Sequence, residues 1–346
     1  MASQELVRFV GGTGSPYTQK MVALLRYRRV PYAVTWGQPA MVCDALGVEK
    51  PKPALMPTFF FDNDGETQAV CDTTPIIRRL EEMYPGRSVL PQDPALAFID
   101  YLIEDFADEW CTKYMFHYRW YLETDADNAG TLLPLGLDVS MPQEQLSEIK
   151  KLITDTQVGR LYVVGSNDTT APVIDASYRR FLTAMENHLA NQKFMLGGRP
   201  GAGDFGLYGQ LTQLVGFDPT PRNITHEVSP RTVAWVDHMH DQCGLEPGEQ
   251  HWVSLQDQPA SLRELMEEIG RVYAPAQLAN ARAVQAGEKS WEAQINGERW
   301  TQPSFSYQAK CLQWTNERYR ALSEHDRALV DTLLQETGVE TMLSLA

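Results

Sequence analysis

The hydrophobic pattern changes character near residue 90 of this chain. Before that point, short β-prone runs alternate with amphipathic helical segments, and after it the pattern is mainly helical. Expected strands lie at residues 6–10, 31–36, 58–61 and 67–70. The last two flank an Asp-Gly turn at 62–65, which is typical of a β-hairpin.

Helix start signals complete the first part. Ser15 is a favoured N-cap and Pro16 suits the first helical position, so a helix begins there, with Met21, Leu24 and Leu25 as its apolar stripe. A second helix begins at Asp72 or Thr73. Residues 38–54 carry three prolines and a glycine, which predicts a loop with at most a short helix. The predicted order is β-α-β-α-β-β-α, the α between the second and third strands being that short helix.

The remaining residues predict helices separated by loops. Apolar positions at helical spacing occur in five segments: 98–121, 179–191, 207–215, 262–273 and 329–334. Residues 125–141 are interpreted as loop-rich, and Asn296-Gly297 is a candidate hairpin turn in the Trp-rich segment 291–314. We predict an α/β domain at 5–86, an all-α domain at 93–250, and a mostly helical extension at 251–346 packed on the all-α domain.

Composition narrows the function classes. The 346 residues carry 45 acidic against 30 basic side chains, a net charge of -15. Such a surface repels phosphate backbones and anionic lipid headgroups, so neither nucleic acid nor a membrane is an expected partner. The sequence has no apolar run of transmembrane length and no export signal at its start. Five scattered cysteines, none in a C-x-x-C motif, are typical of free thiols in a reducing cytoplasm.

Candidate chemistry begins at Ser15-Pro16-Tyr17-Thr18, where the first strand passes into the first helix. A helix N-terminus offers unpaired N–H groups and a partial positive charge, which stabilise an anion such as a thiolate. A hydroxyl at the N-cap can also donate a hydrogen bond to that anion. The alternative is that Ser-Pro is only a good helix start.

Two further elements follow at regular places in the first domain. Met56-Pro57 opens the third strand, where a cis peptide bond would turn the Met56 backbone outward for an extended peptide, and the alternative is an ordinary trans proline. Asp72-Thr73 opens a helix and offers a carboxylate, a hydroxyl and backbone N–H groups, which suit an amino-acid head group. The alternative for this pair is simple helix capping.

In this order and spacing, the three elements resemble the glutathione transferase superfamily, whose N-terminal domain has the thioredoxin fold. Ser15 stands where glutaredoxins have their nucleophilic cysteine, 55–57 is similar to the family's cis-proline signature, and 72–76 is similar to its glutathione-binding turn. The stretch 194–205 resembles a helical-domain motif that contains an N-capping box, of which this chain keeps Asp204 but has Gly201 in place of the Ser or Thr. The resemblance covers roughly residues 5–245 and leaves out the last hundred.

The resemblance implies a cytoplasmic homodimer with glutathione as co-substrate. Ser15 would donate to the glutathione sulfur and favour its thiolate, with Thr13 and Tyr17 as fallback hydroxyls. The backbone of Met56, which precedes Pro57, would form hydrogen bonds with the cysteinyl part of glutathione. Asp72 and Thr73 would hold its γ-glutamyl end. The predicted activity is addition of the thiolate to an electrophilic, apolar small molecule, as in detoxification, or a related isomerisation or ether cleavage.

The second substrate is expected between the Ser15 loop and the long helix at 98–121. The aromatic side chains predicted to line that pocket are Trp110, Tyr114, His117 and Tyr118. The alternative is that they are core aromatics, since aromatic stripes at helical spacing usually pack.

Other functions have less support in the sequence. A metal site is not expected, because only His240 and Cys243 of the H-x-H-x-x-C sequence would share a helix face, and two ligands do not make a zinc site. Ser15 in place of cysteine argues against a thiol–disulfide oxidoreductase. The remaining alternative is a glutathione transferase-fold protein that binds a ligand or a partner protein without catalysis.

Overall fold

The N-terminal domain is a four-stranded mixed sheet with helices on both faces. The structure, a computed structural model, describes residues 6–343, so the predicted ends at residues 5 and 346 lie outside the described residues. The elements are β1 (Val7–Gly11), α1 (Pro16–Arg28), β2 (Tyr32–Trp36), α2 (Pro39–Leu46), β3 (Thr58–Asn63), β4 (Glu66–Val70) and α3 (Thr73–Met83). This order confirms the predicted thioredoxin-like β-α-β-α-β-β-α arrangement, including the short helix.

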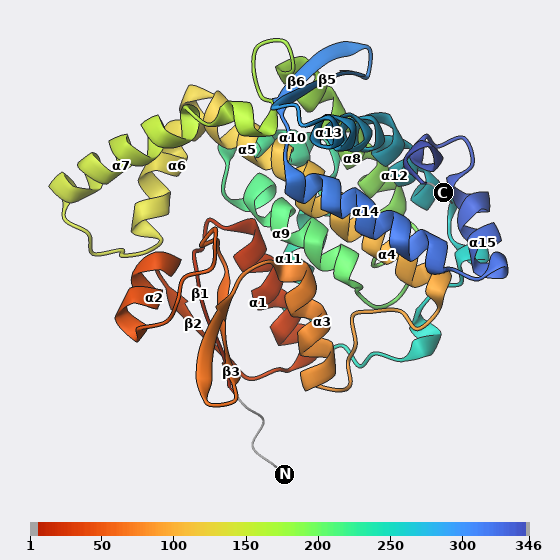
Figure 1. Ribbon diagram of the computed structural model, residues 1–346, viewed down its shortest axis with the longest axis horizontal. Coiled ribbons are helices and arrows are strands. Elements are labelled where there is room, and N and C mark those ends of the chain that lie inside the picture. The colour runs from red at the N-terminus through yellow and green to blue at the C-terminus, as the bar shows by residue number, and fades with distance from the viewer. Residues whose placement is uncertain (1–5, 344–346) are drawn as a thin grey trace.

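Strand pairing explains how the sheet brings distant segments together. The strand order is β2-β1-β3-β4; β1 pairs parallel with β2 and antiparallel with β3, and β3 pairs antiparallel with β4. In this register Val10 lies opposite Thr58, so the end of β1 lies beside the start of β3. In Figure 1, α1 and α3 lie between the sheet and the helical part of the molecule, while α2 lies on the other side.

An all-helical domain follows. Its first two α-helices are joined by a π-helical turn into one continuous run over residues 94–121, which we call the central helix. The elements are α4 (Pro94–Phe106), the π turn (Ala107–Cys111), α5 (Thr112–Tyr121), α6 (Glu123–Leu135), α7 (Gln143–Val158), a 3₁₀ turn (Leu161–Val164), α8 (Ala171–Leu189), α9 (Ala202–Gly216), α10 (Pro219–Val228) and α11 (Pro230–Met239).

The loop-rich interpretation of residues 125–141 is wrong, because α6 occupies most of that segment. The glycine and proline that suggested a loop are both accommodated in the helix. A Cβ at Gly130 would lie 2.4 Å from Thr154 Oγ1 of α7, so glycine allows α6 and α7 to pack closely. Pro134 lies in the last turn of α6, where the helix ends after one more residue.

The start of α9 is capped by two carboxylates. Asp204 accepts from Gly201 N at 2.9 Å, the half of the capping box expected from the sequence. Asp100 of the central helix accepts from Ala202 N at 3.1 Å and from Gly203 N at 2.9 Å. A Cβ at Gly201 would lie 2.2 Å from Asp100 Oδ1, so the glycine admits a carboxylate that replaces the missing hydroxyl.

Residues beyond 250 form further helices and a hairpin against the central helix. The elements are 3₁₀ turns (Glu249–His251 and Leu255–Asp257), α12 (Ala260–Glu268), a π turn (Ile269–Tyr273), α13 (Ala274–Ala286), β5 (Ser290–Ile295), β6 (Glu298–Pro303), α14 (Ser306–Ala321), α15 (Glu324–Leu334) and a last 3₁₀ turn (Val339–Met342). The predicted hairpin at Asn296-Gly297 is present as β5 and β6. We call residues 251–343 the extension; its α14 runs alongside α4 in Figure 1. Among residues 6–343, every helix is too short or too polar to cross a membrane.

Candidate functional site

Ser15 is the N-cap of α1 and is partly exposed. Its backbone is extended, and its Oγ accepts a hydrogen bond from Thr18 N at 3.2 Å. Because the hydroxyl oxygen acts only as acceptor in this bond, its hydrogen is available to donate to an anion at the helix N-terminus. The loop is tied to the helical domain through the Gly14 carbonyl, which accepts from Arg119 Nη1 at 2.8 Å.

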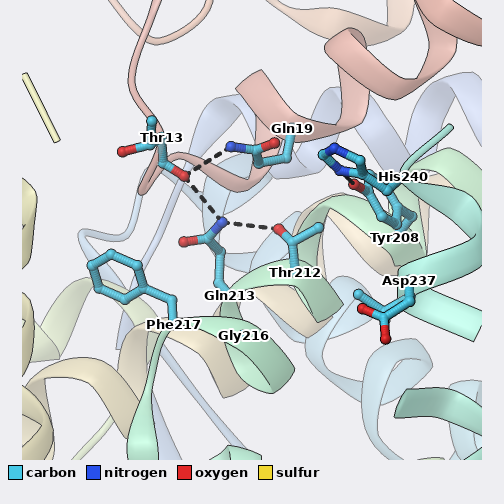
Figure 2. A pocket seen from close by; sticks show the side chains of 10 residues that line it. Thr13, Gln19, Tyr208, Thr212, Gln213, Gly216, Phe217, Asp237 and His240 are labelled. Atoms are coloured by element: carbon cyan, nitrogen blue, oxygen red, sulfur yellow. Dashed lines mark hydrogen bonds between the residues drawn. The ribbon is translucent and has the colours of Figure 1, made fainter. Parts of the chain in front are cut away.

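The two fallback hydroxyls lie in different surroundings. Tyr17 donates its hydroxyl to the Asp108 carbonyl at 2.7 Å, and burial, followed by the charges of Asp108 and Glu109, raises its pKa well above the usual value. The Thr13 carbonyl accepts from Gln19 and Gln213 at 3.0 and 3.4 Å, and Figure 2 shows both amides directed at it. Thr13 also borders a hollow of about 380 Å³ between α1, α9 and α11. Ser15 is not among the residues that line this hollow.

The Met56–Pro57 peptide bond is cis, as is Lys52–Pro53. The pairing of Val10 with Thr58 brings this turn beside the loop that carries Ser15. The contact is close, since a Cβ at Gly12 would lie 3.0 Å from Met56 Sδ. The Met56–Pro57 turn therefore lies beside the loop that leads into α1.

Asp72 and Thr73 open α3, and both side chains are held by other elements. Asp72 is the N-cap, with φ 84°, and its Oδ1 accepts from Thr74 N at 3.3 Å. Its Oδ2 accepts from the hydroxyl of Tyr307 at 2.8 Å. Thr73 is 4% exposed and accepts from Lys20 Nζ at 3.1 Å.

Lys20 is the residue at this junction that sequence reasoning missed. No sequence motif singled it out, and its side chain is 0% exposed. Besides Thr73, its Nζ contacts Glu104 Oε1 at 2.9 Å and Asp108 Oδ2 at 2.6 Å. Burial alone would lower the pKa of Lys20, but these carboxylates raise it above its usual value. One cation thus joins α1, α3 and the central helix.

The π turn supplies two of the carboxylates near this junction. A π turn inserts an extra residue into the helical repeat, which rotates the side chains that follow and is frequent at functional sites. Asp108 faces Lys20, while Asp108 Oδ1 is buried without a hydrogen-bond partner among the described residues. Glu109 accepts from Gln308 Nε2 of the extension at 3.1 Å. Burial raises the pKa of Asp108 to about 6 and that of Glu109 to about 8.

The aromatic residues predicted to line the second-substrate pocket do not lie together in one pocket. Trp110 and Tyr114 are 0% exposed, and the expected pocket role is wrong for both, because Trp110 packs on Trp300 of the extension and Tyr114 on α8. His117 and Tyr118 border a separate hollow of about 520 Å³. Burial lowers the pKa of His117 to about 4.

Of the two metal candidates, His240 has other partners. His240 Nδ1 contacts the hydroxyl of Tyr208 at 3.1 Å, and its Nε2 contacts Arg26 at 2.9 Å. Within residues 6–343, no group of three or more His, Cys, Asp and Glu side chains is arranged to hold a metal ion.

Comparisons with known proteins agree with this geometry at the level of the fold. The family models for the N-terminal and C-terminal domains of glutathione S-transferase match residues 9–88 and 168–238. No curated protein matches the chain. The matched segments include the Ser15 loop, the cis proline and the start of α3, and neither reaches the extension.

Three solved structures are similar to this chain at low sequence identity. A glutathione S-transferase of Ceriporiopsis subvermispora in complex with glutathione is 17% identical, with a TM-score of 0.45, over 68% of this chain and 98% of that one. The beta-etherase LigF from Sphingobium sp. strain SYK-6 is 15% identical, with a TM-score of 0.41, over 67% and 94%. FzlA from C. crescentus is 13% identical, with a TM-score of 0.40, over 67% and 92%.

Proposed function

We propose that this chain, which belongs to the glutathione S-transferase superfamily, binds glutathione beside the N-terminus of α1 and activates its thiol for attack on an electrophilic small molecule. Conjugation, isomerisation and ether cleavage all begin with that thiolate. The observation that carries the proposal is the partly exposed hydroxyl of Ser15 at the helix N-terminus, beside the cis Met56–Pro57 bond.

The site chemistry supports a division of labour along the tripeptide. Ser15 and the N-terminal N–H groups of α1 would stabilise the sulfur anion, because hydrogen bonds to a charged group contribute about 1.5–3 kcal/mol. The Met56 backbone would pair with the cysteinyl part, and Asp72 with Thr73 would hold the γ-glutamyl end. Ser15 is better suited than Tyr17, whose hydroxyl already donates to Asp108.

Ser15→Ala tests this role. We expect activity near neutral pH to fall by about 10²–10³, the usual cost of one preorganised donor to an anion. The pKa of bound glutathione should rise, while its dissociation constant changes little. These are measured by thiolate absorbance in a pH titration and by calorimetry.

A matched control separates catalysis from capping. Ser323 of the extension is also an N-cap: its Oγ accepts from Asp326 N at the start of α15, and its hydroxyl donates to Asp326 Oδ2. Both Ser→Ala variants should lose about 1 kcal/mol of stability. A Ser15→Ala variant that differs from wild type only in its melt, like Ser323→Ala, would reduce Ser15 to a helix cap.

The alternative is a protein of this superfamily that binds a ligand or a partner without catalysis. One observation favours it: Thr73 Oγ1, which would hold the γ-glutamyl end, already accepts a hydrogen bond from Lys20 of the same chain. Absence of glutathione binding to the purified protein would support this alternative. A homodimer in the cytoplasm stays a prediction, and light scattering tests its mass.

A further inference from the structure

The first turn of α14 reaches the start of α3, although the two segments are far apart in sequence. Tyr307 donates its hydroxyl to Asp72 Oδ2 at 2.8 Å across 235 positions of the chain. The next residue, Gln308, donates to Glu109 Oε2 of the π turn at 3.1 Å. Two consecutive residues of the extension therefore hold one carboxylate of the N-terminal domain and one of the central helix.

The Asp72 carboxylate is oriented but not neutralised. Its two oxygens accept from Thr74 N and from the Tyr307 hydroxyl, and both donors are uncharged. A carboxylate has about four lone-pair positions, so these two bonds leave room for further donors. A ligand ammonium group carries three donors and a positive charge, which is the chemistry that a carboxylate with free lone pairs accepts.

The backbone conformation of Asp72 needs support from its surroundings. Its φ of 84° lies in a region that residues other than glycine rarely adopt, and such conformations persist where the surroundings fix them. Thr74 N holds only one oxygen, at 3.3 Å. The Tyr307 hydroxyl supplies the shorter restraint, from a ring that is 43% exposed at the surface.

We propose that Tyr307 is a positioning residue of the glutathione site, holding the Asp72 carboxylate where it meets the free amino group of a γ-glutamyl ligand. Selectivity for that amino group then depends on the extension. This inference rests on the proposed function, and it assigns to the extension a role in recognition as well as in packing. Gln308 fixes the same turn of α14 against the central helix.

The test compares two tripeptides on the full-length chain. Glutathione and glutaryl-cysteinyl-glycine differ only in the amino group that Asp72 would meet. The dissociation constant of glutaryl-cysteinyl-glycine divided by that of glutathione therefore reports that contact, and we call it the selectivity ratio. For Tyr307→Phe we expect this ratio to fall by about 3- to 10-fold, the worth of one hydrogen bond. The pKa of the bound thiol, which depends on Ser15, should stay as in wild type.

Tyr319→Phe is the matched control. Tyr319 also donates to an aspartate, Asp331 Oδ1 at 2.6 Å, but within the extension itself. The ratio of dissociation constants for the Tyr319→Phe variant should equal that of wild type, even if the melting temperature of the variant is lower. In an Asp72→Asn background, Tyr307→Phe should change the ratio no further, because the carboxylate on which it acts is gone.

The outcomes separate the two proposals. A wild-type chain that binds neither tripeptide overturns the proposed function and this inference with it. A wild-type chain that prefers glutathione by a ratio that Tyr307→Phe leaves unchanged overturns this inference alone. A ratio that rises in Tyr307→Phe also overturns it, since Tyr307 would then obstruct Asp72 and not position it.

Discussion

The central helix meets the N-terminal domain on one face and the extension on the other, and its buried charges have different partners on each. Toward the N-terminal domain, Glu104 contacts Lys20 at 2.9 Å and Arg78 at 2.8 Å, and Asp108 contacts Lys20. Toward the extension, the partners are neutral. Asp105 accepts from Tyr273, Glu109 accepts from Gln308, and Lys113 donates to Gln302.

The pKa of Glu104 on the first face and the pKa values of the acidic side chains on the extension face shift in opposite directions. Burial would raise the pKa of Glu104, but Arg78 and Lys20 lower it to about 2. On the extension face, burial raises the pKa of Asp105 to about 7 and that of Glu109 to about 8, and lowers that of Lys113 to about 8. Asp108 is intermediate, since it shares Lys20 with Glu104. Ion pairs thus keep Glu104 charged beside the candidate site, while burial favours the uncharged forms of Asp105, Glu109 and Lys113 toward the extension.

The largest expected effect follows from removing the cation of the first face. Lys20→Met leaves Glu104 and Asp108 buried with less positive charge, and breaking a buried pair in this way costs about 3–5 kcal/mol. Chemical denaturation measures the free energy of unfolding. Lys151→Met is the control, because its pair with Asp155 is exposed to solvent and should contribute little to stability. Similar losses in the two variants would contradict the role given to Lys20.

The same substitution on the extension face should have a much smaller effect. Lys113 is also buried, but its Nζ donates to the amide oxygen of Gln302, which accepts from Trp300 Nε1 as well. In Lys113→Met, the Gln302 oxygen still accepts a hydrogen bond from Trp300, and a positive charge that burial disfavours is removed. We expect a loss of about 1 kcal/mol or less in the same denaturation experiment. A loss as large as that of Lys20→Met would show that the two faces do not differ.

The sequence predicted the parts of this fold whose signals are local. The strands, the Asp-Gly turn and the two helix starts of the N-terminal domain each depend on residues within a few positions of one another. Helix α6 was missed because Gly130 serves close packing against α7, which only the tertiary structure reveals. The burial of Lys20 was missed for a related reason: Glu104 and Asp108 lie 84 and 88 positions away.

The candidate site shows the same limit. Ser15, Met56 and Asp72 were located by helix caps and a proline, which are short-range signals. The Tyr307–Asp72 contact joins residues 235 positions apart, so no local pattern indicated it. Trp110 was assigned to a pocket because its spacing on the helix is the same whether the stripe packs or lines a cavity. Trp300 of the extension covers it, and that contact decided between the two alternatives.

The two faces should also differ in the pH dependence of stability. The pKa of Glu109 in the folded protein is about 8, against 4.5 for a free glutamate, so folding favours its protonated form. Its contribution to stability is complete below pH 4.5 and is lost as pH rises toward 8. Glu109→Gln keeps an oxygen for Gln308 and does not titrate. Denaturation at several pH values should therefore give equal stability for variant and wild type near pH 4.5, and an advantage for the variant that grows up to pH 8 and then levels off.

Glu104 has the opposite shift, so Glu104→Gln should be less stable than wild type at neutral pH, by an amount that shrinks as pH falls from 4.5 toward 2. If both variants lost stability at neutral pH, Glu109 would be held as an ion, like Glu104, and the contrast between the two faces would fail.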